Sequence, residues 1–335
     1  MDAAWLANFW AVVIAVAILV YVVLDGYDLG VGILFGTTTS EQHRVTMMNA
    51  IAPYWDGNET WLVLVGAGLF AAFPMVYAIF LPAFYLPIAL MLLGLIFRGV
   101  AFEFRHRSTR MRPVWDLGFS LGSLLAAFVQ GAAIGTMVQE LKVIDGRYAG
   151  GAFEWVSSFS LLCGAGLVLG YSVLGAAWLV LKTEGDLRAW AYRRLDWLVP
   201  SVAVVLVVLF ALALARHLRV LDRWREDPRL FAMPLLGAVA IVALWYGVRW
   251  RRDGVPFPAA MSVVACAFAA LAVSFWPYMI PYSVTVQQAA APAQSLRFLF
   301  WGAGILMLPV VLIYTALVYW IFRGKVREQG PLESP

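Results

Sequence analysis

The sequence predicts an all-α, polytopic membrane protein. Of its 335 residues, 63% are apolar and only 13% are charged, whereas charged residues make up about 25% of an ordinary soluble domain. The mean hydropathy is +0.81. The apolar residues form continuous runs of about 20, the length of a membrane-spanning helix, and do not alternate as barrel strands would. Because the bilayer core offers no water to the backbone, these runs must be helices.

We predict about nine spans, arranged as two four-helix bundles plus one peripheral helix. In chain order they cover residues 7–35, 58–74, 77–103, 115–138, 155–181, 198–216, 231–249, 257–277 and 297–322. The second and third spans meet at Phe73-Pro74, where proline suits a turn better than a helix interior. If that stretch were one bent helix, the chain would have eight spans. The longest predicted loops, at 36–57, 182–197 and 277–296, are too short to fold as separate domains.

Basic residues are distributed unevenly between the predicted loops. With the N-terminus outside, sixteen of the 24 Lys and Arg residues lie on the cytoplasmic side and eight lie outside. This excess favours a topology with the N-terminus outside and the C-terminus in the cytoplasm. It also explains the net charge of +4 without nucleic-acid binding. The segment from Arg216 to Arg229 departs from the rule, because its basic residues lie on the outer side.

Residue types that hold metals or haem are scarce. Cys163 and Cys266 each lie alone in an apolar run, without metal-ligand spacing. The three histidines, His43, His106 and His217, lie in loops or at span ends, whereas a b-type haem needs its imidazole ligand near mid-membrane. The chain also has no Walker A, GxSxG or HExxH motif. We therefore expect no catalytic residue and no metal ligand in this chain.

Polar residues inside the spans are frequent before residue 140 and scarce after it. An ionisable residue in the membrane is costly and usually faces a partner or a wet cavity. We therefore predict that residues 1–140 form a functional first bundle. Residues 141–335 are predicted to form a mainly structural second bundle with the terminal helix.

The first span contains two carboxylates, Asp25 and Asp28. Their spacing of three places both on one helix face, where mutual repulsion favours proton uptake by at least one of them. Glycines four apart let another helix approach closely; the pairs are Gly26 with Gly30 and Gly32 with Gly36. The alternative is that the carboxylates cap the span or pair with Arg98.

A polar group precedes the second span. Pro53 and Gly57 interrupt regular structure, and Asp56, Asn58 and Glu59 follow or flank them. The simpler interpretation is a helix start, with Asp56 or Asn58 as the N-cap and Glu59 in the first turn. That interpretation accounts less well for three acceptors packed between Trp55 and Trp61, so capping and function both stay open.

The third span carries Arg98 well inside its apolar run, where an arginine must snorkel or pair. Its candidate partners are Asp25 and Asp28. Glu103 is five residues away and lies on a different face of the helix. In the fourth span, we interpret Asp116 as interacting with the helix N-terminus and Gln130 as an interhelical hydrogen-bonding residue.

These motifs, in this order, resemble subunit II of the cytochrome bd-type quinol oxidases, including the cyanide-insensitive branch. The resemblance covers residues 20 to about 125, and the C-terminal half matches in length and span count only. The motifs are Asp25-Gly-Tyr-Asp28-Leu-Gly-Val-Gly32, Asn49-Ala-Ile-Ala-Pro-Tyr-Trp-Asp-Gly-Asn58, Phe70-Ala-Ala-Phe-Pro-Met-Val-Tyr77, Phe97-Arg98, Phe102-Glu103 and Trp115-Asp116.

The resemblance implies a heterodimer in a prokaryotic cytoplasmic (inner) membrane. In that family, subunit I holds haems b and d, oxidises quinol and reduces oxygen to water, and small accessory subunits join in certain members. Subunit II carries no haem ligand and supplies part of a proton route from the cytoplasm. No nucleic-acid partner is implied.

Carried over by position, the resemblance places Asp28 and Asp56 on the proton route. Glu103 is a further candidate, where some relatives have Asp. Trp55 matches a tryptophan that contacts a structural quinone in certain relatives. Asp25 and the supporting residue Arg98 are added from the residues of this chain alone, and Asn58 and Glu59 are further supporting candidates.

The sequence leaves two alternative functions open. A proton-coupled secondary transporter also has several spans, intramembrane carboxylates and Gly/Pro interruptions. Transporters often show an internal repeat, however, and none is evident here. The second alternative is a subunit that only stabilises its partner, with every carboxylate capping a helix or pairing.

Overall fold

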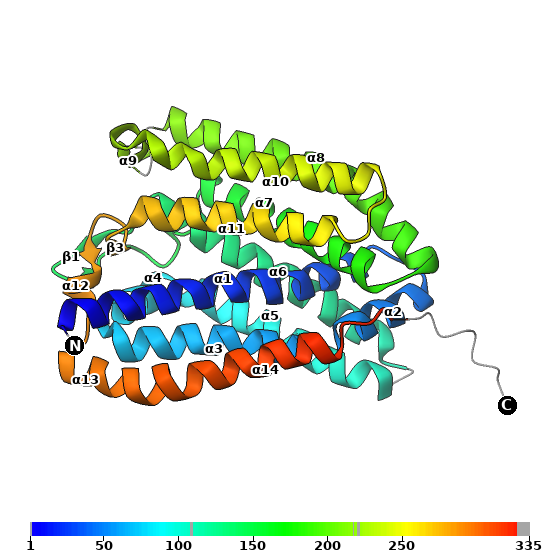
Figure 1. Cartoon of the computed structure of the whole chain (residues 1–335), viewed down its shortest axis with the longest axis horizontal. Helices are drawn as coiled ribbons and strands as arrows, with labels where there is room; N and C mark the ends of the chain where they lie inside the picture. The colour runs from blue at the N-terminus through cyan, green and yellow to red at the C-terminus, as the bar shows by residue number, and fades with distance from the viewer. Residues whose placement is uncertain (1, 108–109, 217, 220–221, 327–335) are drawn as a thin grey trace.

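The structure is a computed structural model that describes residues 2–107, 110–216, 218–219 and 222–326. Long helices run side by side between two ends of the molecule (Figure 1). The first end holds the start of α1, and the second end holds α2 and the end of α14. His217 lies outside the described residues.

The long helices are α1 (Ala3–Phe35), α3 (Trp55–Ala72), α5 (Tyr85–Phe104), α6 (Arg112–Val138), α7 (Ser158–Lys182), α8 (Gly185–Ala215), α10 (Ala232–Arg249), α11 (Pro256–Phe275) and α14 (Leu308–Ile321). Helix α14 is the last part of a longer helical span that begins with α13 (Ala293–Leu299) and continues through a π-helical stretch, η4 (Phe300–Met307). The short helices are α2 (Glu41–Ile51), α4 (Pro74–Ala83), η1 (Arg105–Arg107), α9 (Asp222–Glu226), η3 (Pro228–Phe231) and α12 (Val286–Ala289). Two antiparallel hairpins complete the fold: β1 (Val143–Ile144) with β2 (Arg147–Tyr148), and β3 (Tyr278–Ile280) with β4 (Val284–Thr285).

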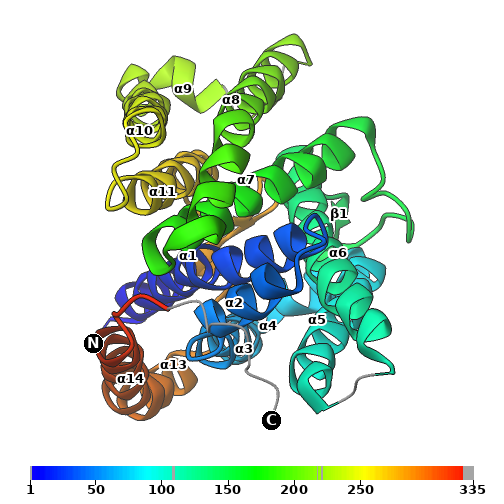
Figure 2. The same cartoon turned by 90° about the vertical axis from the view of Figure 1, so that its right-hand side faces the viewer.

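The all-α polytopic fold is confirmed, with eight to nine long apolar helices. Within the described residues, eight helical segments are long and apolar enough to cross a membrane. Helix α3 is outside that set because its first turns hold Asp56, Asn58 and Glu59. It nevertheless lies beside α1 and α14 and runs between the same two ends (Figures 1 and 2).

The predicted break at Phe73-Pro74 is present, and Pro74 begins α4. The predicted span 77–103 differs, because the chain turns again at Phe84 (φ −116°, ψ 24°) and forms two helices, α4 and α5. The predicted loop 182–197 is wrong as well, since α8 begins at Gly185. Its first turns bury apolar side chains four residues apart, which keeps a polar segment helical; they are Leu187, Ala191 and Leu195.

The glycine pairs of the first span do allow close helix approach, as predicted. A Cβ on Gly30 would overlap the backbone carbonyl of Tyr171 in α7, and one on Gly175 would overlap the backbone of Gly30. A Cβ on Gly32 would overlap the side chain of Ser123 in α6. Helix α1 thus packs against α7 at backbone contact distance and against α6 through the small side chain of Ser123.

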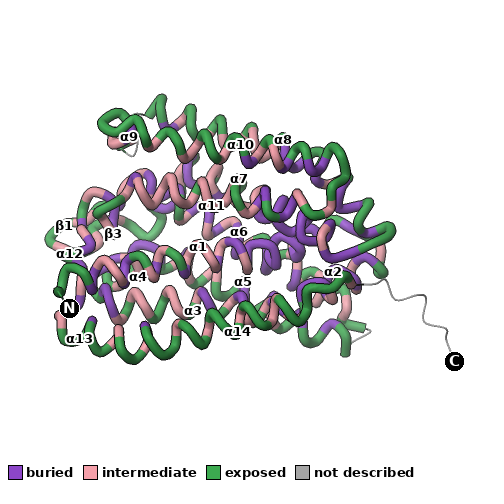
Figure 3. Tube along the Cα trace, viewed as in Figure 1, coloured by how far each residue is buried: buried purple, intermediate pink, exposed green. Residues whose placement is uncertain are grey.

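Burial is centred on α7 and α1 (Figure 3). Among the most apolar residues of each helix, 61% are buried in α7 but only 6% in the final span, which therefore lies at the periphery of this chain. One core cluster joins Tyr27 of α1 with Trp178 of α7. Packing is therefore continuous across residue 140, and the functional division there stays a prediction.

Candidate functional site

Arg98 of α5 pairs with Asp25 of α1 inside the helix bundle. Arg98 Nη1 donates to Asp25 Oδ1 over 2.7 Å, and the two residues are 1% and 0% exposed. The guanidinium carbon also lies 6.0 Å from the centre of the Trp55 ring. One of the two predicted partners of Arg98 is therefore found, and each charge is compensated by the other.

Asp28 lies one turn further along α1 and is 0% exposed. Asn58, near the start of α3, donates from Nδ2 to Asp28 Oδ2 over 2.7 Å. The same amide contacts the hydroxyl groups of Tyr27 and Tyr319, at 2.9 and 3.0 Å. Helices α1, α3 and α14 thus meet at one buried polar group.

Three buried atoms of this site have no hydrogen-bond partner in the described part of the chain: Asp25 Oδ2, Asp28 Oδ1 and Arg98 Nη2. Buried polar atoms in proteins are nearly always bonded to protein or to ordered water. Two acceptors and one donor are a suitable set for a bridging water molecule. Asp25, Asp28 and Arg98 therefore each keep unused hydrogen-bonding capacity inside the bundle.

The remaining predicted residues lie around this centre. Glu59 is half-buried and interacts electrostatically with Arg98, Asp25 and Asp56. Asp56 is exposed, one turn before Glu59 on α3. Trp55 is half-buried and packs against Phe102 with ring centres 5.1 Å apart. Glu103 is exposed at the end of α5 and is not brought into the buried group.

A second polar cluster lies at the second end, between α2, η1 and α6. Arg105 donates from Nε to Asp116 over 2.5 Å and from Nη2 to both oxygens of Glu41, at 2.8 and 3.0 Å. Arg44 also donates to Asp116, over 2.9 Å. Asp116 is therefore an ion-pair partner of two arginines and not simply a helix-terminal charge.

A third cluster lies where the last helix ends. Lys182 is 4% exposed and donates to the hydroxyl of Tyr54 over 2.8 Å and to the carbonyl of Phe322. Burial, with a smaller contribution from the charge of Asp28, raises the pKa of Tyr54 to about 12. Tyr54 therefore stays protonated and donates to the same Phe322 carbonyl, which anchors the end of α14.

Two further polar residues act between helices. Gln130 donates to the hydroxyl of Tyr21 over 2.9 Å and accepts from Tyr171 over 2.8 Å, which confirms its interhelical role. His43 is buried in α2, and its Nε2 lies 2.8 Å from Asp186 of α8. In the part of the chain that the structure describes, no three His, Cys, Asp or Glu side chains are placed to hold a metal ion.

The sequence interpretation missed the tyrosines of the site. Tyr27 stands between the two carboxylates in the motif, but its apolar ring gave no signal of a hydrogen-bonding role. Tyr319 is 261 residues from Asn58 and lies in an ordinary apolar run. Only the packing of α14 against α3 brings it to the site.

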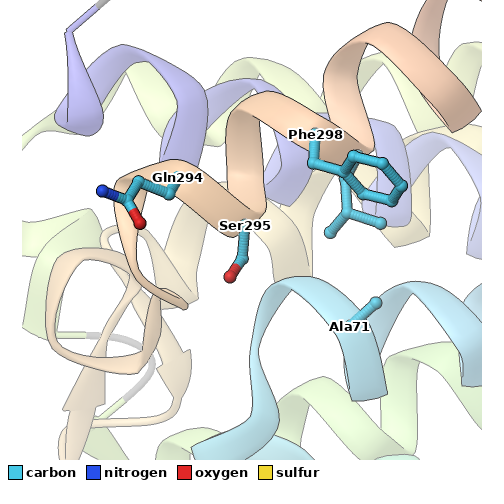
Figure 4. Close-up of a pocket in the computed structure, with 5 residues that line it drawn as sticks. Ala71, Gln294, Ser295 and Phe298 are labelled. Carbon is cyan, nitrogen blue, oxygen red and sulfur yellow. The ribbon is translucent and has the colours of Figure 1, made fainter.

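A surface hollow of the described structure lies away from the carboxylates. It is an open groove of about 420 Å³ at the first end, between α3 and α13. Figure 4 shows Gln294, Ser295 and Phe298 on one side and Ala71 on the other. No charged residue lines it, so it offers no further side chain for proton transfer.

Comparisons with known proteins agree over nearly the whole chain. The sequence model of a family described as cytochrome bd terminal oxidase subunit II matches residues 6–322. The chain is 29% identical to cytochrome bd-I ubiquinol oxidase subunit 2 of Escherichia coli (strain K12), covering 96% of this chain and 95% of that protein. It is also 29% identical to cytochrome bd ubiquinol oxidase subunit 2 of Bacillus subtilis (strain 168), covering 98% of each.

The fold is shared with a solved structure. A chain from the structure of bd oxidase from Geobacillus thermodenitrificans superposes with a TM-score of 0.70 at 17% identity. The match covers 94% of this chain and 99% of that chain.

Proposed function

Because this chain belongs to the cytochrome bd terminal oxidase subunit II family, we propose that its buried carboxylates form part of a proton route to the oxygen-reduction site of the complex. Membership makes the chain subunit II of a cytochrome bd ubiquinol oxidase, a multi-pass membrane protein of a bacterial respiratory oxidase with subunit I as its partner. The transporter alternative is not favoured by any observation on this chain.

The proposal rests on the burial and incomplete hydrogen bonding of the Asp28 carboxyl group. Its carboxyl group is 0% exposed, one oxygen accepts from Asn58, and the other is buried without a hydrogen-bond partner in the described part of the chain. A purely structural carboxylate at such a depth would be expected to have both oxygens satisfied. Asp28 instead keeps a free lone pair beside the Asp25–Arg98 pair, as a group that takes up and releases protons needs.

The polar residues form an ordered series from the surface inward. Asp56 is exposed, Glu59 is half-buried beside it, and Asp28 and Asp25 are buried. Protons would enter at Asp56 and Glu59, pass over bridging water to Asp28, and reach Asp25. Arg98 holds a positive charge next to the acceptors, so the extra negative charge of an ionised Asp28 is tolerated between proton transfers.

Glu103 has a lesser part in this route. It is exposed at the end of α5, so its part would be to collect protons at the surface of this chain. Trp55 covers Arg98 and is the proposed contact of a structural quinone, whose ring it would stack against.

We assign haems b and d to the partner subunit. The two histidines in the described part of the chain do not fit haem ligation: the ring nitrogens of His43 are hydrogen-bonded to Thr38 and Asp186, and His106 is exposed. The residues of this chain therefore move protons, and the redox chemistry takes place in the partner. Uptake of protons from the cytoplasm would separate charge across the membrane without a pump.

The test uses the assembled, membrane-extracted oxidase with Asp28→Asn. Asparagine keeps the shape of the side chain and the contact with Asn58 but cannot carry a proton. We expect quinol-oxidase turnover to fall by about 100-fold or more, with haem content and spectrum unchanged. Asp56→Asn is expected to slow turnover less, because water can replace an exposed carboxylate.

Asp196→Asn is the matched control. Asp196 is a surface carboxylate that is 46% exposed and pairs with Arg251 at 2.9 Å. Its loss should leave turnover unchanged. Normal turnover in Asp28→Asn would remove that residue from the route, and loss of haem together with turnover would favour the purely structural role.

A further inference from the structure

A closed ring of three hydrogen bonds joins Asn58 to two tyrosines. Asn58 Nδ2 donates to the oxygen of Tyr27 over 2.9 Å, and Tyr319 donates to Asn58 Oδ1 over 3.0 Å. The two hydroxyl oxygens lie 2.7 Å apart. Because Tyr319 already donates to the amide, Tyr27 is the donor in the bond between the tyrosines. The ring therefore has a single direction.

The direction of the ring decides which atom Asn58 presents to Asp28. With Oδ1 turned to Tyr319, the second hydrogen on Nδ2 points to Asp28 Oδ2 over 2.7 Å. An ionised carboxylate can only accept hydrogen bonds, so this orientation stabilises charged Asp28. A protonated carboxyl group is a donor and is better matched by the amide oxygen.

We propose that Tyr27, Tyr319 and Asn58 are positioning residues that hold Asp28 in its charged form, and that their ring reverses when Asp28 takes up a proton. This inference rests on the proposed function of Asp28. A half-turn of the amide exchanges Oδ1 and Nδ2. Nδ2 then donates to Tyr319, Tyr319 donates to Tyr27, and both Tyr27 and protonated Asp28 donate to Oδ1. Apart from the O–H bond of protonated Asp28, no covalent bond changes. The ring and its contact with Asp28 keep the same number of hydrogen bonds in both directions, and the reversed amide gives up only the longer bond from Asn58 Nδ2 to the Leu24 carbonyl, at 3.4 Å.

Packing confines the motion to the amide and the two hydroxyl hydrogens. Tyr27 and Asn58 are 0% and 1% exposed. The ring of Tyr27 stacks on Trp178 with centres 4.1 Å apart, and the ring of Tyr319 lies 4.8 Å from that of Tyr54. The side chains therefore stay in place, and only the direction of donation is free to change.

Other charged groups near Asp28 also affect how readily it takes up a proton. Arg98 of α5 favours the ionised carboxylate, whereas Asp25 of α1 and Glu59 of α3 oppose it. The remaining titratable neighbours are the phenols of Tyr27, Tyr54 and Tyr319. None of these groups replaces the hydrogen bond from Asn58 to Asp28 Oδ2. Breaking the ring should therefore change the proton affinity of Asp28 even though these charges stay in place.

The first test is Tyr319→Phe in the assembled oxidase. Phenylalanine keeps the packing against Tyr54 but no longer donates to Asn58 Oδ1, so the amide is less firmly held toward ionised Asp28. We expect Asp28 to keep its proton to higher pH. The midpoint in the pH profile of turnover, identified by its loss in Asp28→Asn, should rise by about 0.5–1 pH unit, which is roughly a three- to tenfold change in proton affinity.

Tyr314→Phe is the matched control. Tyr314 lies on the same helix, five residues earlier, and its side chain is 55% exposed. Its substitution should leave the profile where it is in the unaltered oxidase.

The second test asks whether the ring acts as a unit. Tyr27→Phe opens the same ring from α1, so the double variant Tyr27→Phe with Tyr319→Phe should shift the profile no further than one substitution does. Two independent hydroxyl groups would give additive shifts. Infrared difference spectra give a readout besides turnover: the C=O band of protonated Asp28, assigned by its loss in Asp28→Asn, should move in both single variants.

The outcomes separate the two proposals. Slow turnover in Asp28→Asn, combined with an unchanged profile and an unchanged C=O band in both tyrosine variants, would overturn the ring and leave the proton route standing. Normal turnover in Asp28→Asn would overturn the proton route itself. Additive shifts in the double variant would overturn the reversal and leave two separate donors.

Discussion

Arg98 Nη1 lies 2.7 Å from Asp25 Oδ1, and neither residue is more than 1% exposed. Burial of two charges costs free energy that their mutual attraction offsets only while both are present. We therefore predict that Arg98→Gln lowers the stability of the assembled oxidase by about 3–5 kcal/mol, measured as thermal unfolding in detergent with haem absorbance as the probe. Arg251→Gln, which breaks a half-exposed pair with Asp196, should cost at most about 1 kcal/mol. Equal effects of the two substitutions would contradict this account.

The crossing of α1 and α7 depends on Gly30. A Cβ at this position would overlap the Tyr171 carbonyl, and backbone atoms cannot yield as a flexible side chain can. Gly30→Ala should destabilise the complex by about 1–3 kcal/mol or more. The control is Gly170→Ala in α7, where an added Cβ meets nothing within 4 Å; there the better helix propensity of alanine should leave stability equal or slightly higher. If Gly30→Ala unfolds at the same temperature as Gly170→Ala, the close crossing is not required.

Asp253 forms ion pairs at the second end whose contribution to stability depends on pH. It accepts from Arg188, Tyr192 and Lys325 over 2.9, 2.9 and 3.0 Å. Partial burial acts to raise the pKa of Asp253, but the hydrogen bonds from these three residues outweigh it and hold the pKa below its ordinary value. A carboxyl group whose pKa is lower in the folded state adds stability above its unfolded pKa of about 4 and loses it as the pH falls through the folded value.

The corresponding prediction is that Asp253→Asn is less stable than the unaltered oxidase at neutral pH. The difference in unfolding temperature should shrink as the pH drops below about 4, because both proteins then lack the charge. The measurement is thermal unfolding over a series of pH values in detergent. A difference that grows toward low pH would have the wrong sign for these ion pairs.

The membrane orientation is tested by thiol labelling. Ile144 of the first hairpin is 64% exposed at the first end, and Glu184 is exposed at the second end. In a background without Cys163 and Cys266, we expect Ile144→Cys to react with a membrane-impermeant maleimide while the cytoplasmic membrane is intact. Glu184→Cys should react only after the inner membrane is opened. The reverse pattern would place the N-terminus in the cytoplasm.

The candidate site was partly predictable, because an intramembrane charge in an apolar run requires a partner. That requirement identified Arg98 and the two carboxylates of the first span, and the structure brings Arg98 to Asp25. The same reasoning placed Asn58 and Glu59 near the site as polar residues at a helix start. It had no means of showing that Asp56 and Glu103 stay exposed, since exposure depends on which face of each helix its neighbours cover.

By itself, the sequence determined that the chain is a bundle of membrane-spanning helices, where most of them lie, and which glycines permit close crossing. These features follow from hydropathy and helical spacing, which are properties of neighbouring residues. Only the tertiary structure decided that α8 extends to Gly185, that Asp116 pairs with two arginines, and that Tyr319 completes the site of Asp28. Tyr319 and Asn58 are 261 residues apart, and their contact depends on how whole helices pack, for which a local segment of sequence carries no signal.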